Sequence, residues 1–345
     1  MPDNKPRAIA VDLLSWYDAN ARDLPWRAPP GTNAPDSYRV WLSEIMLQQT
    51  QVASARPYFE KFTARWPSFD ALAAADDSEL MAAWAGLGYY ARARNLLACA
   101  RAVAALGGLP GTEAELRQLP GIGGYTAAAI AAIAFGQRAV VVDANVERVV
   151  ARLFALADPP PGAKKRIHAL TDSITPQSRA GDFAQAMMDL GSGICTARSP
   201  RCLLCPLRPD CAAFASGHPE AYPVKAAKAA KPQRYGTIFW LTRGEQVLLV
   251  RRPAKGLLGG MRALPTGPWA HTPPGLEGAP APAGWQMRDE TAAHGFTHFN
   301  LQLALAAAES GGHEIADGEW WPIAEIESAG LPTVFAKAAR IFGRY

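Results

Sequence analysis

The stretch LPGIGGYTAAAI, residues 119–130, contains a proline and three closely spaced glycines, followed by a run of small residues. We expect a short helix over residues 113–119, a tight turn over 121–123, and a second helix directly after the turn. Unpaired N–H groups at the start of a helix attract anions, and glycine lets a large anion approach the backbone. A helix–hairpin–helix of this kind can hold DNA phosphates without reading the bases. An ordinary turn between two helices is the alternative.

Within this turn, Gly121, Ile122 and Gly123 are the residues that we expect to contact the DNA backbone. The Ile122 side chain would face inward and plug the hairpin. The net charge of the chain is only +4, so charge alone does not indicate nucleic-acid binding. Arginine outnumbers lysine in the first part of the chain, and its planar fork suits phosphates and bases.

The chain has 345 residues, more than one typical domain needs. Residues 1–215 contain long stretches without β-rich runs, such as 38–66 and 78–106, and predict an all-α domain. Residues 216–232 place prolines around an Ala/Lys segment, which is typical of a linker. Residues 233–345 predict a second domain of the α/β or α+β class, so the fold class is multidomain.

The second part of the chain has β-type patterns. Residues 235–252 contain two apolar runs around an Arg-Gly-Glu turn, which predicts a hairpin. Residues 299–305 alternate apolar and polar side chains, as a strand with one buried face does. The Pro/Gly-rich stretch 264–284 predicts a loop, and residues 333–343 predict a final helix. No apolar run reaches membrane-span length and no signal-peptide core is present, so we expect a cytosolic protein.

A cluster of cysteines in CTARSPRCLLCPLRPDC, residues 195–211, predicts a metal site. Disulfides are rare in the cytosol, so the four thiols are candidate ligands for zinc or for an iron–sulfur cluster. The single Cys-x2-Cys pair and the wide outer gaps favour a cubic cluster, while four unrelated buried cysteines are the alternative. The cluster ligands would be Cys195, Cys202, Cys205 and Cys211. Cys99 lies in a helical run and is expected to be a small core residue.

Two carboxylates have the environments that cleavage of a glycosidic bond requires. Asp143 precedes an amphipathic helix, where it can cap the helix and remain an anion. Glu44 lies among apolar neighbours, which would desolvate it, raise its pKa and let it hold a proton near neutrality. Enzymes that hydrolyse glycosidic bonds usually use such a pair, in which one carboxyl group donates a proton and the other, as an anion, stabilises the oxocarbenium ion. A Glu44 on an exposed helix face is the alternative.

These residues resemble the MutY family, the adenine DNA glycosylases of the helix–hairpin–helix superfamily, from about Asp23 to His298. The matching motifs are LPWR (24–27), VWLSEIMLQQTQV (40–52), GLGYYARARN (86–95), LPGIGGYTAAAI, VDANVERV (142–149), the cysteine loop and GLLGGMRALP (256–265). The resemblance implies excision of adenine mispaired with 8-oxoguanine or guanine in double-stranded DNA. It further implies a monomer associated with the nucleoid in the bacterial cytoplasm.

The resemblance also implies roles for single residues. Glu44 would protonate adenine at N7 and then activate water, and Asp143 would stabilise the sugar cation or a covalent intermediate. Tyr125 and Asn145 would support Asp143 and the reacting sugar. The residues that would line or border the adenine pocket are Arg22, Leu24, Trp26, Arg27 and Gln185. Gln49 and Tyr89 would wedge into the duplex beside 8-oxoguanine, and the four loop cysteines would bind a [4Fe–4S] cluster. Simple helix packing is the alternative for Tyr89.

Position 125 separates two reaction types. Relatives similar to endonuclease III have a lysine there, whose amine attacks the sugar and leads to strand cleavage. Tyr125 cannot form a Schiff base, so the resemblance implies a monofunctional glycosylase that leaves an abasic site. A bifunctional glycosylase/lyase and a non-catalytic iron–sulfur DNA sensor remain the competing hypotheses.

The second domain resembles a Nudix fold, but the acidic metal-binding pattern of Nudix hydrolases is absent from its sequence, so pyrophosphate hydrolysis is not expected. In the family this domain contacts 8-oxoguanine through a short Phe-Ser-His loop. Here the corresponding residues are Phe296, Thr297 and His298, in which threonine keeps the hydroxyl and adds a methyl group. An ordinary turn before a strand is the alternative.

Overall fold

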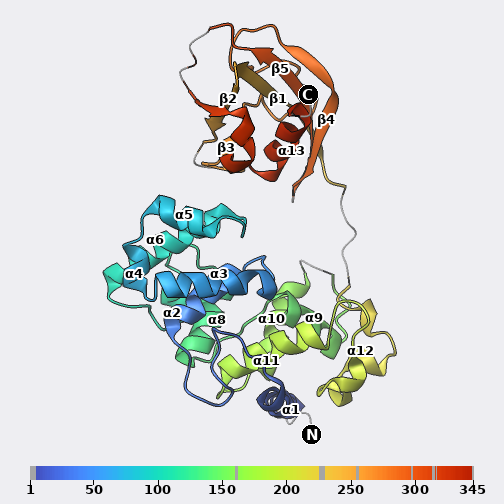
Figure 1. Ribbon diagram of the computed structural model, residues 1–345. Coiled ribbons are helices and arrows are strands. Elements are labelled where there is room, and N and C mark those ends of the chain that lie inside the picture. The colour runs from blue at the N-terminus through green and yellow to red at the C-terminus, as the bar shows by residue number, and fades with distance from the viewer. Residues whose placement is uncertain are drawn as a thin grey trace. The chain divides into compact units, whose positions relative to one another are not determined.

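The computed structural model describes residues 5–159, 162–224, 230–253, 256–296, 298–312, 315 and 317–343 (Figure 1). The chain divides into two compact units, Met1–Ala226 and Ala227–Tyr345. Part of the predicted linker, residues 225–229, lies outside the described residues. No helix among the described residues is long and apolar enough to cross a membrane.

The described residues of the first unit form helices and connecting loops, which agrees with the predicted all-α class. The α-helices are α1 (Lys5–Asn20), α2 (Ser37–Leu47), α3 (Val52–Arg65), α4 (Phe69–Ala73), α5 (Asp77–Trp84), α6 (Tyr90–Leu106), α7 (Glu113–Leu116), α8 (Gly124–Phe135), α9 (Ala144–Leu153), α10 (Ala163–Ile174), α11 (Ala180–Gly193) and α12 (Ala212–Ala215). Short 3₁₀ turns occur at η1 (Cys202–Leu204), η2 (Arg208–Asp210) and η3 (Pro219–Ala221).

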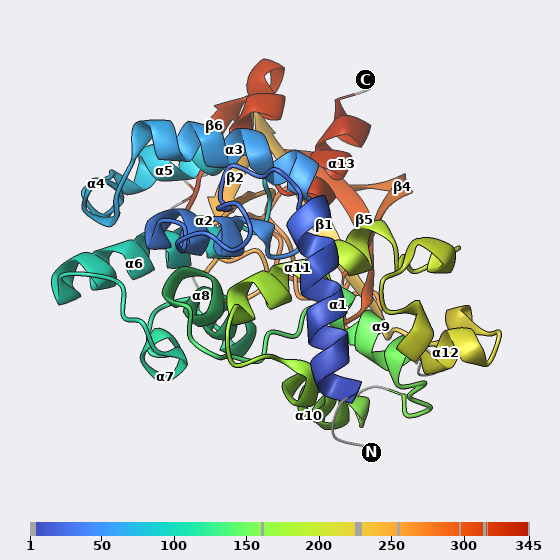
Figure 2. The same ribbon diagram turned by 90° about the horizontal axis from the view of Figure 1, so that it is seen from below.

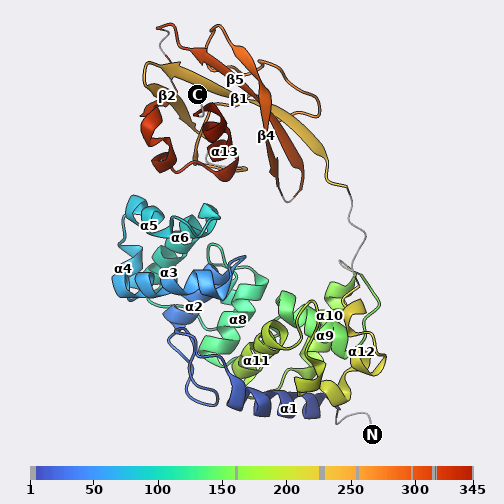
Figure 3. The ribbon, with the colours of Figure 1, turned by 45° about the vertical axis from the view of Figure 1, so that its right-hand side comes forward.

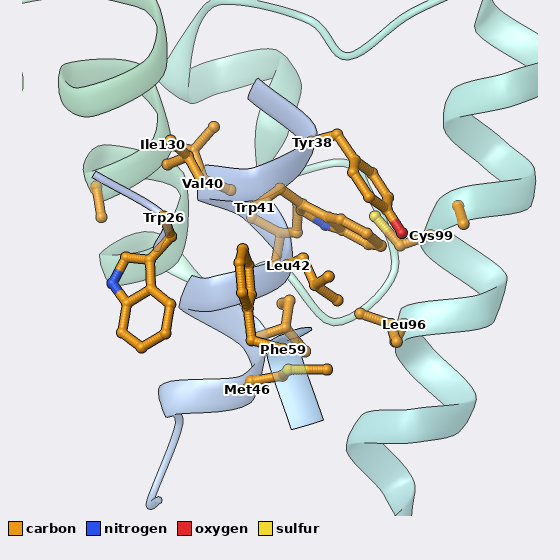
Figure 4. Packing of buried hydrophobic residues seen from close by; sticks show 14 of the residues in the cluster. Trp26, Tyr38, Val40, Trp41, Leu42, Met46, Phe59, Leu96, Cys99 and Ile130 are labelled. Carbon is orange, nitrogen blue, oxygen red and sulfur yellow. The ribbon is translucent and has the colours of Figure 1, made fainter. Parts of the chain in front are cut away.

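Helix α2 is the centre of the larger hydrophobic core. Its residues Trp41 and Met46 are fully buried, and Figure 4 shows them among Phe59 of α3 and Leu96 and Cys99 of α6. Full burial of each large apolar side chain stabilises the fold by roughly 1.5–3 kcal/mol. The packing holds α2 on several sides, and Cys99 is the core residue that the sequence predicted.

A second core joins the helices at the two ends of the first unit. Helix α1 packs against α11 and α10 (Figure 2), and its residues Leu13 and Tyr17 are fully buried. The predicted apolar stripe of α9, which includes Val146 and Val150, is buried in the same cluster. Helices from the start, middle and end of this unit therefore meet around one core.

Each helical stretch expected over 38–66 and 78–106 consists of two helices with a break between them. The first break separates α2 from α3, and Gln49 there has a φ of 56°. The second separates α5 from α6, and Tyr89 has a φ of 50°. Left-handed backbone at a non-glycine residue is uncommon and costs on the order of 1–3 kcal/mol, so tertiary contacts must hold both residues.

The hairpin over residues 113–135 forms as α7, a turn and α8, although α7 ends at Leu116, earlier than expected. Gly121 has a φ of 74°, and a Cβ there would lie 2.7 Å from the Asn95 Cβ, so glycine is required on two grounds. Ile122 is 6% exposed and acts as the predicted plug. No side chain caps the first turn of α8, which leaves its amides for another partner.

The second unit is a mixed sheet with a helix on one face (Figure 3). Its elements are β1 (Gln233–Arg243), β2 (Gln246–Arg251), β3 (Arg262–Ala263), β4 (Gln286–Gly295), β5 (Asn300–Glu309), β6 (Glu319–Pro322), η4 (Ile323–Ala329) and α13 (Thr333–Phe342). The strand order is β3-β2-β1-β5-β4, with β6 paired to β2. The predicted hairpin is confirmed as β1–β2, and β5 runs parallel to β1 from Gln233↔Asn300 to Thr242↔Glu309.

Candidate active site

One cavity of about 630 Å³ in the first unit brings together residues that lie far apart in the sequence. Of the residues predicted for the site, those that line it are Arg22, Leu24, Trp26, Arg27, Glu44, Tyr125, Asp143, Asn145 and Gln185. A cavity of this size suits a small organic group such as one nucleobase. The two carboxylates, Glu44 and Asp143, therefore face one space, which the sequence alone could not establish.

Glu44 lies on α2 and is only 7% exposed. Burial raises the pKa of its carboxyl to about 7, because the charged form loses its water, and the negative charge of Asp143 adds to the rise. A hydrogen bond from Tyr125 and the charge of Arg27 lower the pKa in part. The predicted desolvation of Glu44 is therefore present, and the side chain can hold or release a proton near neutral pH.

Asp143 is the N-cap of α9, as its position before the helix predicted. Its Oδ1 accepts a hydrogen bond from the Val146 N–H at 2.7 Å, and its Oδ2 accepts one from the Asn145 Nδ2 at 2.8 Å. Hydrogen bonds and the positive end of a helix dipole both favour the charged carboxylate. The capping role thus fixes an oriented carboxylate at the cavity wall.

The Asn145 side chain is held in place by Arg148. Arg148 Nη2 donates to Asn145 Oδ1 at 2.8 Å and to the Gly191 carbonyl at 2.6 Å, and Arg148 Nε donates to the Cys195 carbonyl at 2.7 Å. A Cβ at Gly191 would lie 2.6 Å from the Asn145 Cβ, so only glycine permits this approach of α11 to α9. The amide that orients Asp143 is therefore connected to the start of the cysteine loop.

Asp189, which no motif of the sequence indicated, organises the two arginines of the cavity. Asp189 is 4% exposed on α11 and accepts from Arg22 Nε at 2.6 Å and from Arg27 Nη1 and Nη2 at 2.6 and 3.0 Å. It lies one helical turn after Gln185, and that spacing was the available signal. Asp189 balances cationic charge next to Glu44.

Other cavity residues were also missed, because their side chains are chemically unremarkable in the sequence. They are Val40, Ser43, Leu47, Thr50, Gln51, Val52, Ala53, Ile133, Met188 and Ser192. Most are apolar or small, and they come from α2, α3, α8 and α11 and from the break between α2 and α3. Only the packing of these elements shows that they share a surface.

Several predicted site residues lie outside this cavity. Gln49 and Tyr89 occupy the two helix breaks, and Tyr89 is 62% exposed. In the second unit, Phe296 stacks on Trp269 with ring centroids 5.7 Å apart. Lys231 Nζ donates a hydrogen bond to the Phe296 carbonyl at 2.7 Å. His298 is exposed, and Thr297 lies outside the described residues. Outside the cavity, Gln49, Tyr89 and His298 are thus exposed, whereas Phe296 is half-buried.

The cysteine loop connects α11 to α12. Its four thiols lie within electrostatic range, because Cys195 adds to the rise in the pKa of Cys202, Cys205 and Cys211, a rise that comes first from burial. Among the described residues no three His, Cys, Asp or Glu side chains are gathered so as to hold a single metal ion. The loop by itself therefore does not identify its occupant.

A buried cation tests whether an anionic cluster fits this loop. Arg152 is 2% exposed, and within the described part of the chain no ion pair joins it to a carboxylate. Its Nη1 lies 3.3 Å from Cys195 Sγ, and its other bonds go to carbonyls of Thr196, Ala197 and Tyr222. A negative partner lowers the cost of burying such a cation. A cluster held by four thiolates would supply that charge, so the donor set fits.

Two family models match the chain. Residues 42–176 match the HhH-GPD superfamily of base excision DNA repair proteins, and residues 237–340 match the NUDIX domain. The first range contains Glu44, Asp143 and the hairpin, and the second contains all of the mixed sheet except the start of β1. Both parts of the predicted fold class are confirmed.

Curated relatives agree with these matches. An adenine DNA glycosylase of Homo sapiens is 33% identical over 97% of this chain and 74% of its own length. One of Mycolicibacterium smegmatis is 40% identical over 70% of this chain and 80% of its own length. One of Arabidopsis thaliana is 37% identical over 76% of this chain, but the match spans only 48% of that protein.

Solved structures resemble the helical unit. A thermostable thymine-DNA glycosylase superposes with a TM-score of 0.55 at 29% identity, over 62% of this chain and 98% of that one. A non-covalent endonuclease III–DNA complex gives a TM-score of 0.52 at 22% identity, over 63% of this chain and 98% of that one. The second likeness shows a shared fold.

Proposed function

Because this chain belongs to the adenine DNA glycosylases, enzymes of base excision repair, we propose that it removes adenine mispaired with 8-oxoguanine or guanine in double-stranded DNA. The product would be an abasic site in an intact strand. The observation that supports the proposal most strongly is that Glu44 and Asp143 line one cavity that is large enough to admit a base.

Glu44 is the proposed proton donor. With its pKa raised to about 7, part of the population is protonated at neutral pH and can give that proton to N7 of an adenine in the cavity. The protonated base then leaves with the electrons of the bond between N9 and C1′. The resulting Glu44 carboxylate can accept a proton from the water that adds to C1′, which completes the hydrolysis.

Asp143 is the proposed stabiliser of the sugar cation. The bonds from Val146 N–H and Asn145 hold its carboxylate in one orientation before any charge develops at C1′. A preorganised negative charge in a water-poor cavity lowers the barrier without reorganisation. Asn145 is therefore a positioning residue, and Arg148 orients it in turn.

The remaining cavity residues explain how a base could be bound. Leu24 and Trp26 are buried apolar walls, and Gln185 is a buried amide with donor and acceptor groups. Arg22 and Arg27 both bind Asp189, which compensates one of their two charges, and Asp143 adds a second carboxylate to the lining. This combination favours an uncharged heterocycle with polar edges over an anionic ligand.

Tyr125 supports the monofunctional reaction. Its hydroxyl donates to Glu44, and its pKa is raised well above 10, mainly by burial. A neutral phenol has no amine with which to form a Schiff base, so no route to strand cleavage starts from this position. A bifunctional enzyme would need an amine nucleophile, and the residues that line the cavity include no lysine.

DNA binding is proposed to involve the hairpin, the two helix breaks and the second unit. The uncapped first turn of α8, with Gly121, Ile122 and Gly123 before it, would bind phosphates. Gln49 and Tyr89 would enter the duplex, where an aromatic side chain offsets part of the cost of extruding a base. Phe296, Thr297 and His298 would contact the oxidised guanine.

Cys195, Cys202, Cys205 and Cys211 would hold a [4Fe–4S] cluster. When bound, the cluster would act as a structural staple of the loop, with Arg152 as its buried counter-charge. The loop begins at the Cys195 carbonyl that Arg148 binds, so an ordered loop also supports Asn145.

The direct test is base release under single-turnover conditions from duplexes that differ only in the partner of one adenine. We expect alkali-dependent breaks at the adenine opposite 8-oxoguanine and opposite guanine, and none opposite thymine. Breaks without alkali, or a covalent complex trapped by borohydride, would support the bifunctional alternative. Binding without release by iron-loaded protein would support the sensor hypothesis.

A further inference from the structure

Arg92 occupies an unusual place in the first unit. It lies on α6 and is 8% exposed, and burial lowers the pKa of its guanidinium. Every hydrogen-bond acceptor around it is neutral, and within the described residues no ion pair joins it to a carboxylate. Burying a cation in this way costs stability, so the contacts that it makes need an explanation.

One side of the guanidinium closes the end of α2. Arg92 Nη1 donates to the carbonyls of Ile45 at 3.3 Å and Met46 at 2.9 Å and to that of Gln48. Arg92 Nη2 donates to Thr50 Oγ1 at 3.0 Å. These bonds surround Gln49, whose backbone is left-handed, and they satisfy carbonyls at the negative end of the helix that contains Glu44.

The other side holds the second break. Arg92 Nη2 also donates to the Leu87 carbonyl at 3.2 Å and to the Gly88 carbonyl at 3.4 Å. The guanidinium carbon lies 5.4 Å from the centroid of the Tyr89 ring and 5.4 Å from that of Trp84. Tyr89 has the second left-handed backbone and an exposed ring. One planar group thus joins both breaks, which a lysine ammonium cannot do.

The first break borders the cavity. Thr50, Gln51 and Val52 line its wall, and Gln48 Nε2 donates at 3.2 Å to Thr126 Oγ1, the neighbour of Tyr125. We propose that Arg92 is a positioning residue that holds Gln49 and Tyr89 at a fixed separation, so that their entry into the duplex and the delivery of adenine to Glu44 act as one unit. This inference rests on the proposed function of Gln49 and Tyr89.

The test compares Arg92→Lys with Arg101→Lys. Arg101 lies on the same helix and binds the carbonyls of Ala73 and Ala75 and the carboxylate of Asp77, away from the residues that line the cavity. Single-turnover excision is measured for adenine opposite 8-oxoguanine and for adenine opposite an abasic-site analogue, which leaves the base unpaired. Because extrusion of a paired base costs a few kcal/mol, we expect Arg92→Lys to slow the first substrate about thirtyfold and the second less than about threefold.

A double-mutant cycle with Tyr89→Ala separates positioning from general damage. If Arg92 acts through Tyr89, the double variant loses at most about threefold beyond the slower single variant. The inference would be overturned if the rate losses of the two single variants multiply in the double variant, or if Arg92→Lys slows both substrates equally. It would also be overturned if Arg101→Lys changes the two excision rates in the same way as Arg92→Lys. If Arg92→Lys does not fold, Thr50→Val serves instead, because it removes one bond to the same guanidinium. Thr50→Val must also slow excision opposite 8-oxoguanine more than excision opposite the abasic-site analogue, though both factors will be smaller. A wild-type protein that releases no adenine would refute the proposed function instead.

Discussion

The Tyr125 hydroxyl lowers the pKa of the Glu44 carboxyl inside the cavity that Asp143 also lines. Burial is the first cause of the raised pKa of both side chains. The contact joins α8, which follows the turn proposed to bind DNA, to α2, which contains the proposed proton donor. It therefore links the turn that is proposed to bind phosphate with the residue that is proposed to protonate the base.

Adenine release should depend on the protonated form of Glu44. We expect the rate to fall about tenfold per pH unit above about 7, because the pKa of Glu44 is raised to about 7. Glu44→Gln should lower the single-turnover rate by at least about 100-fold at and below pH 7, and it should abolish this fall above pH 7. Glu60→Gln, at an exposed position of α3, is the control. A Glu44→Gln variant that keeps the same pH profile would contradict the assignment.

The same carboxyl should make the folded protein less stable at higher pH. Its pKa is raised from 4.5 to about 7, so the folded state binds more protons between these values and stability falls as pH rises through this window. Glu44→Gln removes the buried charge. It should therefore be more stable than the wild type above pH 7, by on the order of 3 kcal/mol, and should gain little below pH 4.5. Urea unfolding at several pH values measures the difference.

Tyr125→Phe should move the alkaline limb of the pH–rate profile upward. The hydroxyl lowers the pKa of Glu44, and a phenyl ring removes that bond without adding charge. A hydrogen bond to a charged group contributes about 1.5 kcal/mol or more, so we expect a shift of roughly one pH unit. An unchanged limb together with a slower rate would mean that Tyr125 serves the sugar and not Glu44.

Asp189→Asn should move the same limb in the opposite direction. Arg27 lowers the pKa of Glu44, and Asp189 compensates the charge of Arg27 at 2.6 Å. Without that carboxylate the positive charge near Glu44 increases and favours its ionised form. Asp182→Asn, on the same helix but paired with Arg179, is the matched control. A shift in both variants would indicate a general effect of charge on α11.

Cys205→Ser should remove bound iron. Wild-type protein should contain about four irons and four inorganic sulfides per chain, with the visible absorption of a [4Fe–4S] cluster. The variant should lose both, while Cys99→Ala, which alters the buried cysteine of the α2 core, should keep them. Stoichiometric zinc in the wild type would contradict the cluster proposal.

Local features of the sequence were sufficient for much of the fold. The turn at Gly121–Gly123, the cap at Asp143, the alternation in β5 and the hairpin β1–β2 depend on neighbours within a few residues. The burial of Glu44 was also predictable, because its neighbours on α2 are mostly apolar and are buried like it. Propensity, capping and periodicity depend on residues that are close in sequence, so they can be recognised before the packing of the helices and strands is known.

The breaks that contain Gln49 and Tyr89 depend on the tertiary structure. Their left-handed backbones are not encoded by glycine at those positions, and Arg92, distant from Gln49 in sequence, is what satisfies the freed carbonyls. The role of Asp189 likewise depends on how α11 packs against residues 22–27.

The sequence by itself thus determined an all-α unit with a glycine-rich turn between two helices, a second unit with strands and a final helix, a cysteine loop and two carboxylates of suitable character. Only the tertiary structure decided that Glu44 and Asp143 face one cavity, that Asp189 compensates its arginines and that Arg92 joins the two helix breaks. The physical reason is that a charge is tuned, and a strained backbone is held, by whatever lies next to it in space. Those neighbours come from helices that the chain brings together only when it folds.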